Sequence, residues 1–225
     1  MTEVAMLEIM TAAQAPGFQG PWDGVLPPQD QNTLFRMHTF DTIADVKDKS
    51  PNAIAVTNSN VTVGSDVHGS FMKFNGTNSS LAFSSPLLDG NSYDVTFIMG
   101  DIAFPSTAQY DVTILDGRPN ITNGRYLTWG YSKTLPFRST ISYQGAGVFG
   151  TIPVPGDQFP IVYKISVRPG SLRAYANGKM IQEWLLADTA MTGNAPWRVG
   201  RNAYVQQAAT PWLNGKVYYI DFKKV

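Results

Sequence analysis

The sequence predicts an all-β protein, a sandwich of two antiparallel sheets, and three observations lead to that prediction. Tight-turn dipeptides recur along the chain, many short stretches alternate apolar and polar residues, and no segment has the pattern of a long helix. The composition agrees, because only 15% of the 225 residues are charged, where about 25% is usual. We expect roughly a dozen strands, which two packed sheets would bury economically.

Residues 1–35 differ from the rest and are expected to form an N-terminal arm ahead of a sandwich at 36–225. Pro and Gly are too dense in the second half of this arm for regular structure. Before them, Val4, Leu7 and Met10 recur at every third position, which predicts a short amphipathic helix. A helix of this length needs a surface to pack on. Two surfaces stay open: the body of the same chain, or a neighbouring subunit or larger assembly.

Turn signals punctuate the chain after residue 38. Asn-Gly and Asp-Gly pairs supply the positive φ angles of tight hairpins, and they stand at 75–76, 89–90, 116–117, 123–124, 177–178 and 214–215. Between the turns lie alternating or β-branched runs, which predict strands at Ala53–Thr57, Leu81–Phe83, Tyr93–Phe104, Tyr110–Leu115, Tyr126–Tyr131, Thr140–Tyr143 and Val148–Ile152. The sequence has no repeat of fixed period, which disfavours propellers and solenoids.

The clearest unit is a three-stranded meander at Ile161–Trp184. Apolar residues alternate through its first strand, Arg168–Ser171 turns the chain, and Asn177-Gly178 turns it again. A last strand is predicted at Lys216–Lys224. We expect its two faces to carry Tyr218, Ile220 and Phe222 on one side, and Val217, Tyr219, Asp221 and Lys223 on the other.

Several short motifs follow one another between residues 38 and 225, and their order is more informative than any single motif. They are Thr39-Phe40-Asp41, Asp48–Ala53, Phe71–Leu81, Tyr93–Met99, Ser171–Lys179, Trp197–Arg201 and Trp212–Phe222. In this order they resemble the concanavalin A-like lectin and glucanase domains of the laminin G-like type. The resemblance implies a jelly-roll sandwich. The matched positions are structural in that family, so the resemblance alone does not imply a function.

Charge and residue counts exclude several classes of function. Seventeen Lys and Arg balance seventeen Asp and Glu, so we expect no electrostatic binding of nucleic acid. The chain has no Cys and only two His, which excludes disulfides and thiol chemistry and leaves few metal ligands. No secretory signal peptide or long apolar run is visible, so we expect synthesis in the cytoplasm and no membrane insertion.

The residues needed for catalysis do not fall into a catalytic pattern. Glycosidases of the family that the chain resembles carry a Glu-x-Asp-x-x-Glu strand, which sets two carboxylates on one face. The glutamates of this chain are scattered: Glu3, Glu8 and Glu183. A loop-like stretch holds Asp41, Asp45 and Asp48, where turn hydrogen bonds are the expected role. His38 and His68 lie near no Ser nucleophile motif. We therefore expect no catalytic residues.

No cofactor is expected, although calcium stays possible. Some laminin G-like domains bind calcium through loop carboxylates and carbonyls. The loop carboxylates that could serve here are Asp66, Asp116 and Asp157. They follow no recognisable ligand pattern, so no metal site is assigned.

Two stretches combine aromatic rings with polar side chains, as sugar-binding sites do. The first is expected on adjacent strands of one face and contains Trp129, Tyr131 and Tyr143. The second runs from Arg201 along an expected rim loop and contains Asn202, Tyr204 and Trp212. For Trp129 and Trp212, packing in the core is the alternative.

Two classes of function stay open. The favoured one is a structural or interaction component of a larger assembly. The chain is similar to bacteriophage virion accessories, such as capsid decoration or tail-associated proteins with a lectin-like domain. Its partners would be copies of itself or other virion proteins, and its place would be the virion. The alternative is a free-standing carbohydrate-binding module, and a glycoside hydrolase with an atypical site ranks third.

Overall fold

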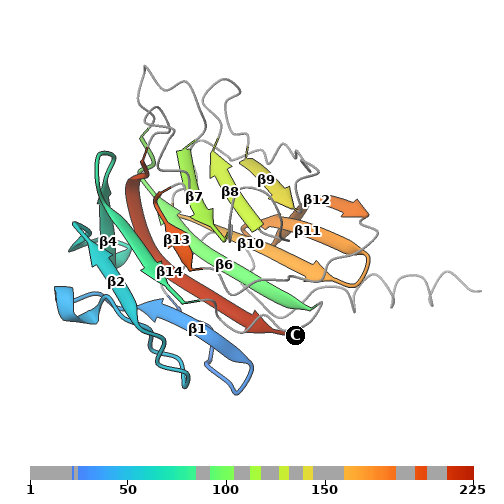
Figure 1. The fold of residues 1–225 in the computed structure, drawn as a ribbon, viewed down its shortest axis with the longest axis horizontal. Helices are drawn as coiled ribbons and strands as arrows, with labels where there is room; N and C mark the ends of the chain where they lie inside the picture. The colour runs from blue at the N-terminus through green and yellow to red at the C-terminus, as the bar shows by residue number, and fades with distance from the viewer. Residues whose placement is uncertain are drawn as a thin grey trace, which may run out of the picture.

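Two antiparallel β-sheets pack face to face in the computed structural model (Figure 1). The structure describes residues 22, 25–84, 92–103, 112–117, 127–131, 139–143, 160–185, 196–201 and 212–225, with side chains except at 112, 127–131 and 139–143. One sheet has eight strands and the other has six. The architecture confirms the predicted all-β, two-sheet antiparallel sandwich.

The larger sheet has the order β12-β11-β10-β6-β14-β4-β3, and β1 also pairs with β14. Its strands are β1 Thr33–His38, β3 Thr62–Asp66, β4 Gly69–Asn75, β6 Tyr93–Gly100, β10 Ile161–Arg168, β11 Ser171–Ala176, β12 Lys179–Leu185 and β14 Asn214–Lys224. The last strand of the chain therefore lies inside the sheet. β4 borders its first residues, β1 borders its last residues, and β6 runs along its other side.

The smaller sheet has the order β2-β5-β13-β7-β8-β9. Its strands are β2 Val56–Ser59, β5 Ser80–Phe83, β7 Val112–Asp116, β8 Leu127–Tyr131, β9 Ser139–Tyr143 and β13 Trp197–Val199. Within the described ranges the one helical segment is a 3-10 turn at Ile43–Asp45. No helix in those ranges has the length and apolar character needed to cross a membrane.

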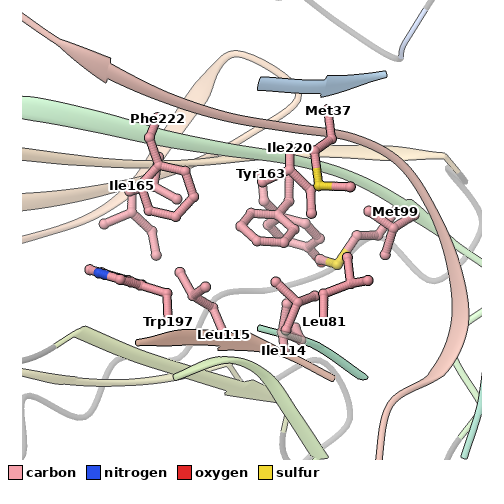
Figure 2. Close-up of a cluster of buried hydrophobic side chains, with 14 of the residues drawn as sticks. Met37, Leu81, Met99, Ile114, Leu115, Tyr163, Ile165, Trp197, Ile220 and Phe222 are labelled. Carbon is pink, nitrogen blue, oxygen red and sulfur yellow. The ribbon is translucent and has the colours of Figure 1, made fainter. Parts of the chain in front are cut away.

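The core lies between the two sheets (Figure 2). Phe222 and Ile220 of β14 point into it from the larger sheet, and Trp197 and Leu115 reach it from the smaller one. The rings of Trp197 and Phe222 meet edge to face, with centroids 5.2 Å apart. Each such buried side chain contributes about 1.5–3 kcal/mol to folding, which explains why the alternating apolar residues of the sequence settle on the inner faces.

Several predicted strands can be compared with the observed ones. The meander is confirmed as β10, β11 and β12. The strand predicted at Tyr93–Phe104 ends at Gly100, because Asp101 takes a positive φ of 49° and turns the chain. β1 begins at Thr33, before the expected start of the sandwich at residue 36. The strand predicted at Val148–Ile152 lies outside the described residues.

A β-bulge changes the predicted faces of the last strand. The pairing of β14 with β6 shifts between Val217 and Tyr219, and a bulge of this kind breaks the alternation of side chains. Val217 therefore packs in the core with Ile220, while Tyr218 joins Tyr219 in an apolar cluster on the opposite face. The expected grouping of Tyr218 with Ile220 and Phe222 was therefore wrong, and so was that of Val217 with Tyr219.

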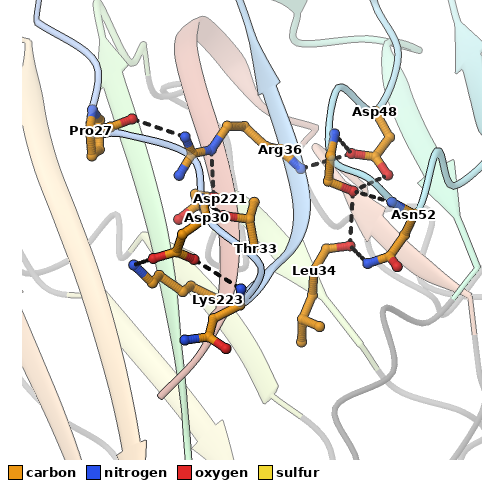
Figure 3. Close-up of polar contacts among 11 residues, drawn as sticks. Pro27, Asp30, Thr33, Leu34, Arg36, Asp48, Asn52, Asp221 and Lys223 are labelled. Carbon is orange, nitrogen blue, oxygen red and sulfur yellow. Dashed lines mark hydrogen bonds and ion pairs between the residues drawn. The ribbon is translucent and has the colours of Figure 1, made fainter.

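The described part of the arm packs on the outer face of the larger sheet of its own chain. The Trp22 ring lies 5.2 Å from the Tyr218 ring, and Leu26 packs on the same outer cluster. The arm is also held by polar contacts: the Pro27 carbonyl accepts a hydrogen bond from Arg36 (2.9 Å), and Asp30 pairs with Lys223 at 2.6 Å (Figure 3). The predicted helical residues lie outside the described part of the chain: Val4, Leu7 and Met10.

Candidate functional site

Four segments meet at one end of the sandwich, and we call this end the rim: residues 75–79, 101–103, 200–201 and 212–214. Main-chain hydrogen bonds join them. They run from Gly76 N to Leu213 O (2.9 Å), from Leu213 N to Gly200 O (3.0 Å) and from Ala103 N to Asn214 O (2.8 Å). The Leu213 side chain is fully buried in the core. Leu213 therefore anchors the middle of the rim in the core of the sandwich.

Gly200 allows the chain to leave β13 in the direction of the rim. Its φ is +81°, in the region that favours glycine. A Cβ at this position would lie 2.6 Å from Cδ1 of the buried Phe74 ring, much closer than van der Waals contact. Its N–H donates to the Ile114 carbonyl (2.9 Å). Local sequence thus explains the geometry, because only glycine fits this turn.

Arg201 and Trp212 lie together at the rim, one on each side of the chain segment 202–211. The Arg201 Cζ atom lies 5.2 Å from the centre of the Trp212 ring, within the range of a cation–π contact. Both side chains are half-buried. The hydrogen bond between Gly200 and Leu213 brings the two residues together. The structure therefore places the predicted Trp212 beside a guanidinium group.

A turn after β4 adds amide and hydroxyl groups to the rim. The Asn75 side-chain oxygen accepts hydrogen bonds from the N–H groups of Thr77 (2.9 Å), Asn78 (3.0 Å) and Ser79 (3.2 Å). The Asn75 amide nitrogen donates to the Asn78 side-chain oxygen (2.8 Å). This network orders the turn, while the side chains of Thr77 and Asn78 remain exposed. Sequence analysis treated Asn75-Gly76 only as a turn signal and missed these groups.

Beside the rim, Lys216 bridges two aspartates on the outer face of the larger sheet. Its Nζ lies 2.7 Å from Asp66 and 2.6 Å from Asp101, and the Tyr218 hydroxyl donates to Asp66 (2.8 Å). Burial acts to raise the pKa of Asp66, but hydrogen bonds from Lys216, the His68 N–H and Tyr218 leave that pKa below its ordinary value. The two carboxylates raise the pKa of Lys216. Lys216 is shared by both carboxylates, so this cluster keeps one excess negative charge.

Strands β8 and β9 carry the first predicted set of aromatics, and they are adjacent as expected. Their register pairs Trp129 with Ile141 and Leu127 with Tyr143, and β7 pairs Leu115 with Trp129. The register sets positions 129, 131 and 143 on the sheet face of Leu115, which is a core residue. The side chains of Trp129, Tyr131 and Tyr143 are not described, so their role in ligand binding stays a prediction.

Two residues of the second predicted set, Asn202 and Tyr204, lie outside the described residues. Trp212 is therefore the member of that set whose surroundings are known. Arg201, which opens the stretch in the sequence, is brought to it by the geometry described above. Their contact joins residues eleven positions apart in the sequence. No local pattern predicts it.

Three of the acidic residues considered for catalysis have local structural contacts, while Glu3 and Glu8 lie outside the described residues. Glu183 of β12 pairs with Arg173 of β11 (2.7 Å). Asp45 accepts a hydrogen bond from the Thr42 N–H (2.8 Å). Asp48 is buried and accepts hydrogen bonds from the N–H groups of the loop around it, one of them from Ile54 (2.7 Å). These contacts agree with the turn role expected for the Asp45 region.

The two histidines lie at different places on the larger sheet. His68 is exposed at the β3–β4 hairpin, and His38 is half-buried at the end of β1. Burial and then the charges of Lys49 and Arg36 lower the pKa of His38. Among the residues with described side chains, no group of three or more His, Asp or Glu is placed to hold a metal ion. Of the possible calcium ligands, Asp66 pairs with Lys216 and Asp116 is buried.

Sequence comparisons give no relative for this chain: no protein-family model matches it, and no curated protein does. Solved structures do match. Domain 4 of AbnA, a GH43 extracellular arabinanase from Geobacillus stearothermophilus, was solved in complex with arabinotriose. It is similar with a TM-score of 0.65 and 16% identity over 86% of this chain and 92% of that domain.

Binding domains of botulinum neurotoxins are also similar. The serotype D/C domain matches with a TM-score of 0.65 and 11% identity over 86% of this chain and 49% of that one. The serotype G domain matches with a TM-score of 0.63 and 11% identity over 86% and 48%. This chain thus spans about half the length of the toxin domains. At these identities the likeness shows the fold alone, a β-sandwich consistent with the jelly roll that the resemblance implied.

Proposed function

We propose that the protein is a non-catalytic, lectin-like domain that binds carbohydrate at its rim. The observation that carries this proposal is the Arg201–Trp212 pair at the base of the segment 202–211. The fold supports it, because the similar arabinanase domain was solved with arabinotriose. Another similar structure is that of a type C botulinum neurotoxin, whose cell entry depends on interaction with two ganglioside molecules.

The chemistry of the rim suits a sugar ring. The C–H face of a sugar stacks on an aromatic ring, and its hydroxyl groups need donors and acceptors around that ring. Trp212 supplies the ring, and the exposed Thr77 and Asn78 supply hydroxyl and amide groups from the neighbouring turn. Main-chain hydrogen bonds hold these segments in place, which lowers the entropic cost of binding a ligand.

The first test is a glycan array probed with the full chain and with Trp212→Ala. We expect binding to one class of glycan. We also expect affinity to fall about 5-fold or more in Trp212→Ala, since stacking on an aromatic ring contributes about 1 kcal/mol or more. Tyr175→Ala is the matched control, because Tyr175 is a half-buried aromatic on β11, away from the rim. Unchanged binding by folded Trp212→Ala would refute the site.

A second candidate function is that of an assembly component, in particular a bacteriophage virion accessory located in the virion. Exposed apolar side chains on the edge strand β12 favour it: Met180 is 49% exposed and Leu185 is 85% exposed. Such side chains at a sheet edge are suited to contact with another subunit. The partners would be other copies of the chain or other virion proteins.

Light scattering after size exclusion tests this second candidate. Because Trp22 and Leu26 pack on their own sandwich, the deletion to compare with the full chain is residues 1–21, which spares those contacts. We expect the full chain to self-associate and Leu185→Lys, which adds a charge to the β12 edge, to be a folded monomer. The deletion variant tests whether residues 1–21 contribute to the same association. A full chain that stays monomeric at high concentration would contradict the assembly role. Turnover in a hydrolysis screen on polysaccharides would overturn the non-catalytic assignment.

A further inference from the structure

Arg201 differs from most of the described arginines in its surroundings. Three others bind a carboxylate directly: Arg36 binds Asp221 at 2.9 Å, Arg168 binds Asp94 at 2.9 Å and Arg173 binds Glu183 at 2.7 Å. Arg198 lies directly opposite the buried Asp116 in the β13–β7 ladder. Within the described part of the chain, the Arg201 side chain forms a cation–π interaction with the ring of Trp212 and no ion pair with a carboxylate.

No carboxylate of the described rim forms an ion pair with Arg201. The exposed or half-buried side chains of its turns are neutral, such as Asn75, Thr77, Asn78 and Asn214. One acid belongs to the described rim, Asp101, and it already pairs with Lys216 at 2.6 Å. Within the described rim, Arg201 is therefore a cation without a carboxylate partner, held beside an aromatic ring.

A guanidinium in this position is suited to bind an anion. A cation–π contact uses the face of the guanidinium, while the N–H donors lie in its plane and can bind two oxygens of one anionic group side by side. The half-buried ring of Trp212 also reduces the exposure of Arg201 to water, which strengthens a charge-assisted hydrogen bond. A sugar that stacked on the ring would carry its substituents close to these donors.

We infer that the rim selects sugars that carry an anionic group, a carboxylate or a sulfate ester, and that Arg201 binds this group. The inference rests on the proposed carbohydrate-binding function and narrows it to a ligand class. The aromatic ring supplies affinity for the sugar, and the guanidinium supplies the preference for charge.

The experiment is a calorimetric titration of the full chain with three oligosaccharides. Arabinotriose is the neutral probe, trigalacturonate carries carboxylates, and a chondroitin sulfate tetrasaccharide also carries sulfate esters. We expect at least one anionic probe to bind 10-fold or more tightly than arabinotriose. The carboxylated and sulfated probes then distinguish which anionic group the rim prefers.

Variants connect this preference to Arg201. Arg201→Gln should weaken binding of the anionic probe by about 10- to 100-fold, as expected for the loss of hydrogen bonds to a charged group. Binding of arabinotriose should weaken much less than binding of the anionic probe, because a neutral sugar has no charged group for Arg201 to bind. The affinity of Arg201→Lys for the anionic probe should lie between those of the wild type and Arg201→Gln, because lysine keeps the charge but not the paired donors. Arg173→Gln is the control, since Arg173 pairs in register with Ser166 and lies toward the sheet end opposite the rim.

The possible failures can be told apart. If arabinotriose binds as tightly as both anionic probes, or if Arg201→Gln binds the anionic probe normally, the inference is overturned while the carbohydrate-binding function stands. If none of the three probes binds and the glycan array is also blank, the proposed function itself fails. Tighter binding of an anionic probe that is lost in Arg201→Gln supports both.

Discussion

Arg36 and Asp221 form an ion pair between β1 and β14, and the arm covers it. Both residues are buried, and the Arg36 side chain also contacts the Tyr219 ring and the Pro27 carbonyl. Burial raises the pKa of the Asp221 carboxyl, and the charge of Arg36 opposes that rise. The pair therefore depends on both members, because either charge alone would be buried without compensation.

Replacing one member of this pair should destabilise the fold strongly. Arg36→Ala should lower the free energy of unfolding at pH 7 by about 3–5 kcal/mol. Without Arg36 the pKa of Asp221 rises further, and a raised folded-state pKa means that stability falls as the pH rises through it. The deficit measured by urea unfolding should thus be smaller at pH 4 than at pH 7. A loss below about 1 kcal/mol at pH 7 would contradict this account of the pair.

Asp66 should give the opposite dependence on pH. Its pKa is held below the ordinary value of 3.8, chiefly by Lys216 once the opposing effect of burial is included. A lowered folded-state pKa contributes stability above the unfolded value, and this contribution is lost as the pH falls through the folded value. Asp66→Asn should cost about 1 kcal/mol at pH 7, the usual size for a partly exposed pair. In urea melts the difference from the wild type should vanish near pH 2.

A third prediction concerns a single residue, Gly200. Gly200→Ala should destabilise the fold by about 2–4 kcal/mol, because it adds both the strain of a positive φ and a clash with the buried Phe74 ring. Gly69→Ala is the matched control. Its φ is +115°, but among the described residues its Cβ would meet Trp22 alone, at 3.6 Å, so about 1–2 kcal/mol of strain is expected. Thermal melts of the two variants should separate the effects, and equal losses would show that Phe74 adapts.

At the scale of elements, local patterns predicted the hairpins well and the irregular strands poorly. The meander β10–β12 was predicted from alternating apolar residues and two turn signals. Both signals are local, since neighbouring residues in the sequence carry them. β1 was missed because its central position, Arg36, is a buried cation that looks like surface in a sequence. The bulge at Val217–Tyr219 was missed because it depends on packing: Tyr218 turns outward to meet Trp22 and Phe71, which lie far away in the sequence.

In the candidate site, too, local features were predictable and long-range contacts were not. Trp212 was a predicted ligand residue, since an aromatic next to a polar loop is visible in sequence. Its contact with Arg201 was not predictable, because a hydrogen bond between Gly200 and Leu213 creates it. The ordered Asn75 turn was equally invisible, since the same residues could form a turn without exposing Thr77 and Asn78 beside the rim.

The packing of the arm on the sandwich can be tested with a single substitution. Leu26→Ala should lower the free energy of unfolding by about 1–2 kcal/mol, because a half-buried leucine leaves the cluster that contains Ile98, Val162 and Tyr219. Val25→Ala is the control on the neighbouring residue, whose side chain is 66% exposed. If both variants melt like the wild type, the arm contacts contribute little to stability.

For the whole molecule, the topology makes folding depend on the last residues of the chain. β14 fills the space between β6 on one side and β1 and β4 on the other. Deletion of residues 219–225 would leave β1 without its partner and would remove Ile220 and Phe222 from the core. We expect this variant to lose its cooperative urea transition. A transition with an unchanged slope would mean that the sheet closes without β14, contrary to this topology.

The direction of β14 also determines how the molecule could be tethered. Asn214 begins the strand at the rim, and Lys224 ends it roughly 30 Å away, given about 3.4 Å per residue. The Lys224 N–H bonds to the Asn32 carbonyl (2.8 Å), so the strand is fastened at that distal pole. A passenger domain or a particle joined to Val225 would hold the sandwich by its base, leaving Trp212 and Arg201 at the outward tip.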